Sequence, residues 1–159
     1  MRLMVARQNP QPPSLTDPDM KPAAERHAYF EHDADIGVAG RGATMEEAFE
    51  SAATGMFAIM TELPAVHRDR TVRVEFEEAD IELALVRWLN LLLATAREHG
   101  MVFAEFRLER DGVVWRGSAT GETWRHELER GTEVKGATLT MLKVEQCNNE
   151  WQARCVVDV

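Results

Sequence analysis

The sequence predicts a single α+β domain, in which a mixed, largely antiparallel sheet has two helices packed on one face. Two long segments, residues 44–60 and 80–99, repeat apolar side chains at helical spacing. Two tight turns, Asp111-Gly112 and Asn148-Asn149, each separate two strand-like runs and predict antiparallel hairpins. The chain has 159 residues, which is the size of one domain with one hydrophobic core.

The N-terminal segment, residues 1–26, is predicted to be a disordered extension, so that the folded domain spans residues 27–159. Its apolar residues show almost no periodicity. It contains five of the six prolines, namely Pro10, Pro12, Pro13, Pro18 and Pro22. Alternating residues then predict a strand from residue 27 and a second one at 36–40, which ends in the turn Gly40-Arg41-Gly42.

The first helix is expected to begin at Thr44, because Thr44-Met45-Glu46-Glu47 matches the capping box. Pro64 is expected to stop it. Its core-facing stripe consists of Met45, Ala48, Phe49, Ala52, Ala53, Met56, Phe57 and Met60. The methionines in this stripe are interpreted as core residues, since methionine fills gaps in cores far more often than it binds a ligand.

The second helix is expected to follow a strand at residues 71–76, with Asp80 as its N-cap and Gly100 just after its last turn. Two hairpins complete the chain. The first joins residues 101–109 to 113–119, and the second joins 136–147 to 150–159. The highly charged stretch between them, residues 121–135, is expected to be irregular.

The two cysteines, Cys147 and Cys155, are predicted to remain reduced. In the expected hairpin Cys155 lies opposite Leu142, about 16 Å along the ladder from Cys147. A disulfide needs Cα atoms within about 7 Å of each other. The sequence has no apolar run near the roughly 20 residues that cross a bilayer, and it has no secretory signal. Together with reduced thiols, these features predict a cytoplasmic protein without a membrane partner.

The charge balance argues against direct, surface-wide binding of nucleic acid. The chain carries 18 Lys and Arg against 27 Asp and Glu, for a net charge of −9. A duplex-binding protein needs a positive surface. An acidic domain is better suited to metal ions or to a basic protein partner.

The most unusual stretch is YFEHDADIG at residues 29–37, which places three carboxylates and a histidine among apolar residues. In an extended strand Glu31, Asp33 and Asp35 share one face, and His32 lies on the other. Carboxylates about 7 Å apart repel each other unless water, a cation or a basic group screens them. Spacing alone leaves both an exposed strand end and an ion site open.

Other chemistries find little support. The pair His32-Asp33 resembles the His-Asp pair of metal phosphohydrolases, but the remaining histidines lack the spacing which that site requires. No phosphate-binding loop, zinc-ligand spacing or nucleophile elbow is present in the sequence. The residues themselves therefore indicate an acidic domain with a candidate metal site and no recognisable set of catalytic residues.

Four collinear motifs resemble the archease family over residues 27–159. They are HDADIG at 32–37, AFESAA at 48–53 with GMF at 55–57, GTEVK at 131–135, and VVDV at 156–159. The family usually has threonine at the position of Asp33, so this chain adds a negative charge there.

The resemblance implies a protein cofactor rather than an enzyme. Archease proteins promote the guanylylation and multiple turnover of the GTP- and manganese-dependent tRNA-splicing RNA ligase. By position, the divalent ion of the family, taken to be calcium, would be held by Asp35, Asp158 and the backbone carbonyl of Val159. Asp33, His32 and Lys135 would act through water or face the partner.

Three alternatives remain open at this point. One is a stand-alone metal-dependent hydrolase that uses Asp33 and Asp35 as ligands. Another is a chaperone or interaction module whose metal is purely structural. For Lys135, an ion pair with Glu133 or Glu129 in the loop competes with partner contact.

Overall fold

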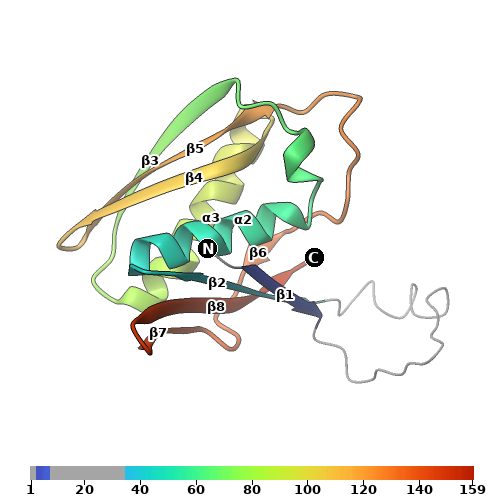
Figure 1. Ribbon diagram of the computed structural model, residues 1–159. Coiled ribbons are helices and arrows are strands. Elements are labelled where there is room, and N and C mark those ends of the chain that lie inside the picture. Colours follow the sequence, from blue (N-terminus) through green and yellow to red (C-terminus); the bar gives the residue numbers. More distant parts are fainter. Residues whose placement is uncertain (1–2, 8–34) are drawn as a thin grey trace, which may run out of the picture.

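The computed structural model describes residues 3–7 and 35–159, whose strands form two antiparallel sheets with the helices between them (Figure 1). The first sheet has five strands in the order β1-β2-β8-β6, with β7 also paired to β8. The second has three strands in the order β3-β5-β4. The strands are β1 (Leu3–Arg7), β2 (Asp35–Gly42), β3 (Arg70–Glu77), β4 (Met101–Asp111), β5 (Val114–Thr123), β6 (Gly136–Ala137), β7 (Lys143–Cys147) and β8 (Glu150–Asp158).

The α+β class, the two helices and the single domain are confirmed, and the number of sheets differs from the expectation. The strands expected in one sheet are divided between two, and each sheet packs one face against the helices. Alternation of apolar and polar residues shows that a strand has one buried face. It does not show which other strands share that face, and so the division between sheets was not predicted.

Helix α2 (Met45–Ala58) begins as the capping box predicts. The Thr44 hydroxyl oxygen accepts a hydrogen bond from the Glu47 N–H at 3.1 Å, and the Glu47 carboxylate accepts one from the Ala43 N–H at 2.9 Å. The helix ends before Pro64, which lies in the short 3-10 helix η1 (Leu63–Ala65). These contacts satisfy N–H groups that have no partner within the helix.

Helix α3 (Ile81–His99) also has the expected ends. One carboxylate oxygen of Asp80 accepts hydrogen bonds from the N–H groups of Glu82 and Leu83, at 2.9 and 3.0 Å. Gly100 follows with a φ of +63°, a left-handed conformation that glycine adopts without steric cost. None of the helices in residues 35–159 is long and apolar enough to span a membrane.

Both hairpins form at the expected turns. In the first, Asp111 pairs with Val114 around Gly112, whose φ is +65°. In the second, Asn148 and Asn149 both have positive φ, as a type I′ turn requires. Both cysteines are free. Burial raises the pKa of the Cys155 thiol to about 12, which favours the protonated form.

The expected disorder of residues 1–26 is corrected for one segment. Leu3–Arg7 forms strand β1, which pairs antiparallel with β2, from Leu3 opposite Gly40 to Arg7 opposite Ile36. The backbone N–H and C=O groups of β2 thus gain partners on their outer edge. The rest of the predicted extension, and the strand expected at residues 27–33, lie outside the described residues.

The hydrophobic core lies between the two sheets and around both helices. The Trp88 indole N–H on α3 donates a hydrogen bond to the Phe49 carbonyl on α2 at 3.0 Å, which ties the two helices together. Phe49 also stacks on Trp115 of β5, with ring centroids 5.2 Å apart. Helix α2 therefore contacts α3 on one side and the second sheet on another.

Candidate functional site

Two aspartates of the sequence motifs meet at one end of the first sheet. Asp35 is the first residue of β2 and Asp158 is the last residue of β8. The two strands are antiparallel neighbours, and their register places Asp35 directly opposite Asp158. Residues directly opposite each other on antiparallel strands have Cα atoms about 4.5–5.5 Å apart and side chains on the same face of the sheet.

This face of the sheet points away from the helices. Along β2 the exposure alternates, with Ile36 and Val38 buried and Asp35 half-buried on the opposite face. On β8 the buried Val157 precedes the exposed Asp158. Two carboxylates therefore share the outer face beside solvent. Like charges directly opposite each other in a sheet are destabilising, unless a cation compensates them.

The GTEVK segment, residues 131–135, lies beside this pair. The backbone N–H of Lys135 donates a hydrogen bond to the carbonyl oxygen of Asp158 at 2.8 Å, and the next residue, Gly136, pairs with Asp158 in the β6–β8 ladder. Arg97 on α3 anchors the same segment, because its Nη2 donates to the carbonyls of Val134 and Lys135 at 2.8 and 2.9 Å. Two motifs far apart in sequence thus meet at Asp158.

Of the remaining predicted site residues, the structure describes some and not others. Val159 directly follows Asp158 and is half-buried against the hydrophobic core. His32 and Asp33 lie outside the described residues, so the structure tests neither of them.

The arrangement suits a hard divalent cation. Asp35 and Asp158 offer carboxylate oxygens, and the backbone at the end of β8 offers carbonyl oxygens. Calcium and magnesium take such oxygen ligands, and calcium fills its remaining positions with water.

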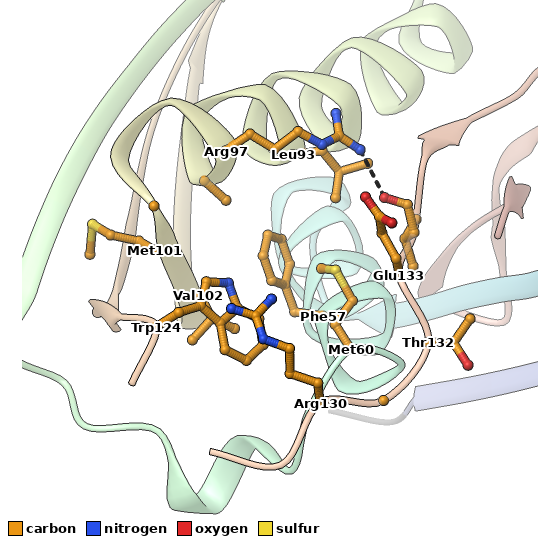
Figure 2. A pocket seen from close by; sticks show the side chains of 14 residues that line it. Phe57, Met60, Leu93, Arg97, Met101, Val102, Trp124, Arg130, Thr132 and Glu133 are labelled. Carbon is orange, nitrogen blue, oxygen red and sulfur yellow. Dashed lines mark hydrogen bonds between the residues drawn. The ribbon is translucent and has the colours of Figure 1, made fainter. Parts of the chain in front are cut away.

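A second feature is a pocket of about 460 Å³ that borders the GTEVK segment (Figure 2). Apolar side chains from both helices form its interior, and residues 130–134 form one wall. Arg130 stacks over the Trp124 ring, with its guanidinium carbon 3.9 Å from the ring centroid. Arg97 and Leu93 lie on the opposite side of the pocket in the same view.

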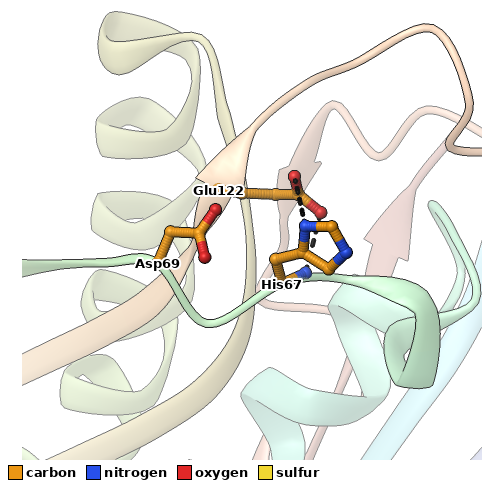
Figure 3. Close-up of side chains that lie close together, drawn as sticks. All are labelled: His67, Asp69 and Glu122. Carbon is orange, nitrogen blue, oxygen red and sulfur yellow. Dashed lines mark hydrogen bonds and ion pairs between the residues drawn. The ribbon is translucent and has the colours of Figure 1, made fainter.

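A third feature is a cluster of His67, Asp69 and Glu122, whose potential metal-ligating atoms all lie within 4.8 Å of one another (Figure 3). Glu122 is only 5% exposed. One of its oxygens accepts a hydrogen bond from the His67 backbone N–H at 2.7 Å, and the other accepts one from Arg125 Nε at 2.8 Å.

Arg125 supplies the positive charge of this cluster. Its guanidinium also donates to the Ala65 carbonyl at 2.9 Å. Burial raises the pKa of Glu122, but the hydrogen bonds from Arg125 and from the His67 backbone outweigh it, and the net pKa lies below its usual value of 4.5. The hydrogen bond to Glu122 raises the pKa of Arg125. We therefore interpret the cluster as structural: its hydrogen bonds and the Glu122–Arg125 ion pair hold the 65–69 segment against the end of β5.

Replacing Glu122 with glutamine should lower stability mainly near neutral pH. Because folding lowers the Glu122 pKa, its contribution is complete above the unfolded-state pKa of about 4.5 and is lost as the pH falls through the folded-state value. The difference in free energy of unfolding between wild type and Glu122→Gln should therefore be largest at pH 6–7 and shrink towards pH 3.

Urea denaturation at several pH values measures this difference. The matched control is Glu105→Gln, since Glu105 pairs with Arg68 on an exposed surface where ion pairs contribute little. A Glu122→Gln difference that stays constant between pH 7 and pH 3 would contradict the interpretation.

The sequence alone predicted neither the pocket nor the cluster around Glu122. Glu122 and His67 are 55 positions apart, and neither belongs to a motif with recognisable spacing. The only local signal was the pair Glu122 and Arg125, three residues apart in a segment that was expected to be irregular.

Known proteins match this chain over most of its length. The model of the Archease protein family (MTH1598/TM1083) matches residues 27–159. Protein archease of Thermococcus gammatolerans is 36% identical over 140 residues, which covers 84% of this chain and 99% of the relative. Protein archease of Thermococcus kodakarensis is 37% identical over 137 residues, covering 82% and 96%.

Two solved structures share the fold. The solution structure of Methanobacterium thermoautotrophicum protein 1598 is 32% identical, with a TM-score of 0.72 over 79% of this chain and 92% of that one. The crystal structure of a Thermotoga maritima protein, described as an archease and possible chaperone, has a TM-score of 0.57 at 19% identity, covering 77% and 89%, and supports the fold alone. With the family model and these relatives matching most of its length, the chain belongs to the archease family.

Proposed function

We propose that this protein is a metal-binding protein cofactor, not an enzyme, which activates a GTP- and manganese-dependent RNA ligase of tRNA splicing and RNA repair. It would promote guanylylation of the ligase and allow multiple turnovers. The observation that carries the proposal is the register that sets Asp35 opposite Asp158 at the end of the first sheet. Membership of the archease family supports the class of partner.

The proposed metal ligands are the carboxylates of Asp35 and Asp158 and the backbone carbonyl of Val159, with calcium as the expected ion. When bound, the ion supplies a local positive charge on an otherwise acidic surface. Asp33 and His32, in the same motif, are proposed to act through water or to face the ligase. Lys135 is proposed to contact the ligase as well, since its backbone is held beside Asp158.

The charge of the chain fits this role better than direct contact with RNA. Residues 27–159 carry a net charge of −10, since residues 1–26 contribute four basic and three acidic side chains. Such a surface repels phosphates and attracts basic protein surfaces. The protein would thus act on the ligase, in the cytoplasm, rather than on its RNA substrate.

Guanylylation of the RNA ligase from the same organism is the direct test. With labelled GTP and manganese, the rate of covalent GMP transfer to the ligase should rise when the protein is added at sub-stoichiometric amounts. The isolated protein should hydrolyse neither nucleotides nor phosphoesters with manganese or calcium present. An unchanged guanylylation rate would reject the proposal.

The same experiment separates the alternatives. Metal-dependent hydrolysis by the isolated protein, lost in Asp35→Ala, would support a hydrolase. A chaperone, the role suggested for the Thermotoga maritima protein, would increase the amount of soluble ligase without changing the guanylylation rate of each folded ligase molecule.

A further inference from the structure

The pocket beside the GTEVK segment has the composition of a binding site for part of another protein (Figure 2). We propose that it binds an acidic-aromatic segment of a partner protein. An aromatic side chain would enter the apolar interior, and a neighbouring carboxylate would pair with Arg97 and Arg130 at the rim. This inference concerns the pocket alone and requires neither a bound metal nor the ligase.

The interior of the pocket is apolar and of suitable size. Phe57, Leu93 and Val102 are at most 3% exposed, and they line a volume of about 460 Å³. Ligand pockets commonly span about 300–1,000 Å³ and are lined mostly by apolar side chains. An aromatic side chain has the largest apolar area to bury in such a site, roughly 150–250 Å².

Arg130 is held in place for anion binding. Its guanidinium lies over the Trp124 ring at 3.9 Å, which restricts an otherwise flexible side chain. Within the described residues, its N–H groups donate no hydrogen bond. A stacked guanidinium keeps its donors in the plane of the group, where they match the two oxygens of a carboxylate.

Arg97 provides a second fixed donor group on the other side of the pocket. Its Nη2 is occupied by the carbonyls of Val134 and Lys135. Its Nε and Nη1 have no acceptor in the part of the chain that the structure describes. Since guanidinium has five N–H donors, this side chain can hold the loop and bind an anion together.

The charge of the rim selects an acidic peptide. The charged lining residues are Arg97, Arg130 and Glu133, so the rim is net positive within an acidic domain. A peptide with one or two carboxylates can pair with Arg97 and Arg130 alone, and it needs no further positive charge on the domain. A nucleic acid strand carries a negative charge on every phosphate and would also be repelled by the net negative charge of the domain. The observations therefore favour a protein segment.

The pocket lies next to the loop that contacts Asp158. Its wall, residues 130–134, continues directly into Lys135, whose N–H is bonded to Asp158. A partner segment in the pocket would thus contact the same loop that borders the aspartate pair. Both features would lie on one continuous interaction surface.

Peptide titration of the full-length protein, followed by two-dimensional ¹H–¹⁵N NMR, tests the proposal. The probe is acetyl-Glu-Trp-Glu-amide. The controls are acetyl-Lys-Trp-Lys-amide, which reverses the charge, and acetyl-Glu-Ala-Glu-amide, which lacks the aromatic ring. The probe should shift the Trp124 indole signal and the amides of residues 130–134, with at least about tenfold higher affinity than either control.

Two variants localise the site. Arg130→Gln should weaken probe binding by at least about fivefold, and Ala96→Leu, which adds volume inside the pocket, should weaken it as well. Arg73→Gln, the same change at an exposed position on β3, is the matched control and should bind the probe like wild type. Amide spectra of each variant establish that it is folded.

The proposal is overturned if the probe causes no shifts at millimolar concentration, if the shifts lie away from the pocket, or if Arg130→Gln binds equally well. Binding of indole-3-acetate without binding of the peptide would reassign the pocket to a small aromatic acid. Displacement of the probe by an oligouridylate would reassign it to RNA. Since no ligase or metal is present, a negative result leaves the proposed function standing, and failure of ligase activation leaves this test unaffected.

Discussion

Asp158→Ala should abolish stimulation of ligase guanylylation and leave the protein folded. The substitution removes one of the two carboxylates that the β2–β8 register places opposite each other, so a divalent ion loses a charged ligand. Asp35→Ala should have the same effect on stimulation. Stimulation should fall to background in both variants, while Asp33→Thr, which introduces the residue usual in the family, should retain it.

Stability without metal provides an independent readout for Asp158→Ala. Asp158 is exposed, and substitutions at exposed positions usually change stability by less than about 0.5 kcal/mol, so the metal-free melting temperature should stay near that of wild type. Calcium should raise the melting temperature of wild type and not that of the variant.

Asp111→Ala is the matched control, because it removes an exposed aspartate from the β4–β5 turn of the other sheet. It should retain both ligase stimulation and the calcium-dependent rise in melting temperature. Full stimulation and an unchanged calcium response in Asp158→Ala would rule out the aspartate pair as the metal site.

Gly40→Ala should strongly destabilise the domain. A Cβ atom at Gly40 would lie 2.3 Å from the Ala48 carbonyl oxygen and 2.3 Å from the Ala52 backbone nitrogen, so the backbone of α2 would have to move away from β2. Overpacking of a core typically costs about 1–3 kcal/mol, and a rigid helix backbone places this site at the upper end, about 3 kcal/mol. For a domain of this size, this lowers the melting temperature by about 6–12 °C.

Urea denaturation of Gly40→Ala and Gly136→Ala measures the effect. Gly136 is the control, because the nearest atom to its added Cβ is the side-chain oxygen of Asn90 at 3.4 Å, an approach that a small side-chain shift relieves. The control should lose less than about 1 kcal/mol, the usual range for a mild substitution. Equal stability of the two variants would show that α2 tolerates displacement from the first sheet.

The sequence was most informative where structure depends on near neighbours. The capping box at Thr44, the N-cap at Asp80 and the positive-φ residues Gly100, Asn148 and Asn149 were all predicted and are all present. Each of these signals involves hydrogen bonds or backbone conformations within about four residues. The motifs that resemble the archease family are equally readable, because they are defined by residue identity and order.

The sequence also predicted that Asp35 and Asp158 would meet, and the register confirms that they are directly opposite. This long-range prediction depended on the resemblance to a family, whose motifs place both residues at one ion. Their role as metal ligands remains a prediction, as do the roles of Asp33 and His32.

By itself, then, the sequence determined the helices, their ends, the hairpin turns and the family, because these follow from local hydrogen bonding and from residue identity. Tertiary structure alone decided the division of the strands between two sheets and the pairing of β1 with β2. It also decided the surroundings of the Glu122–Arg125 ion pair and the pocket between Arg97 and Arg130. Sheet partners and pocket walls depend on which buried faces pack together. That choice minimises exposed apolar surface over the whole chain, and no local pattern of residues encodes it.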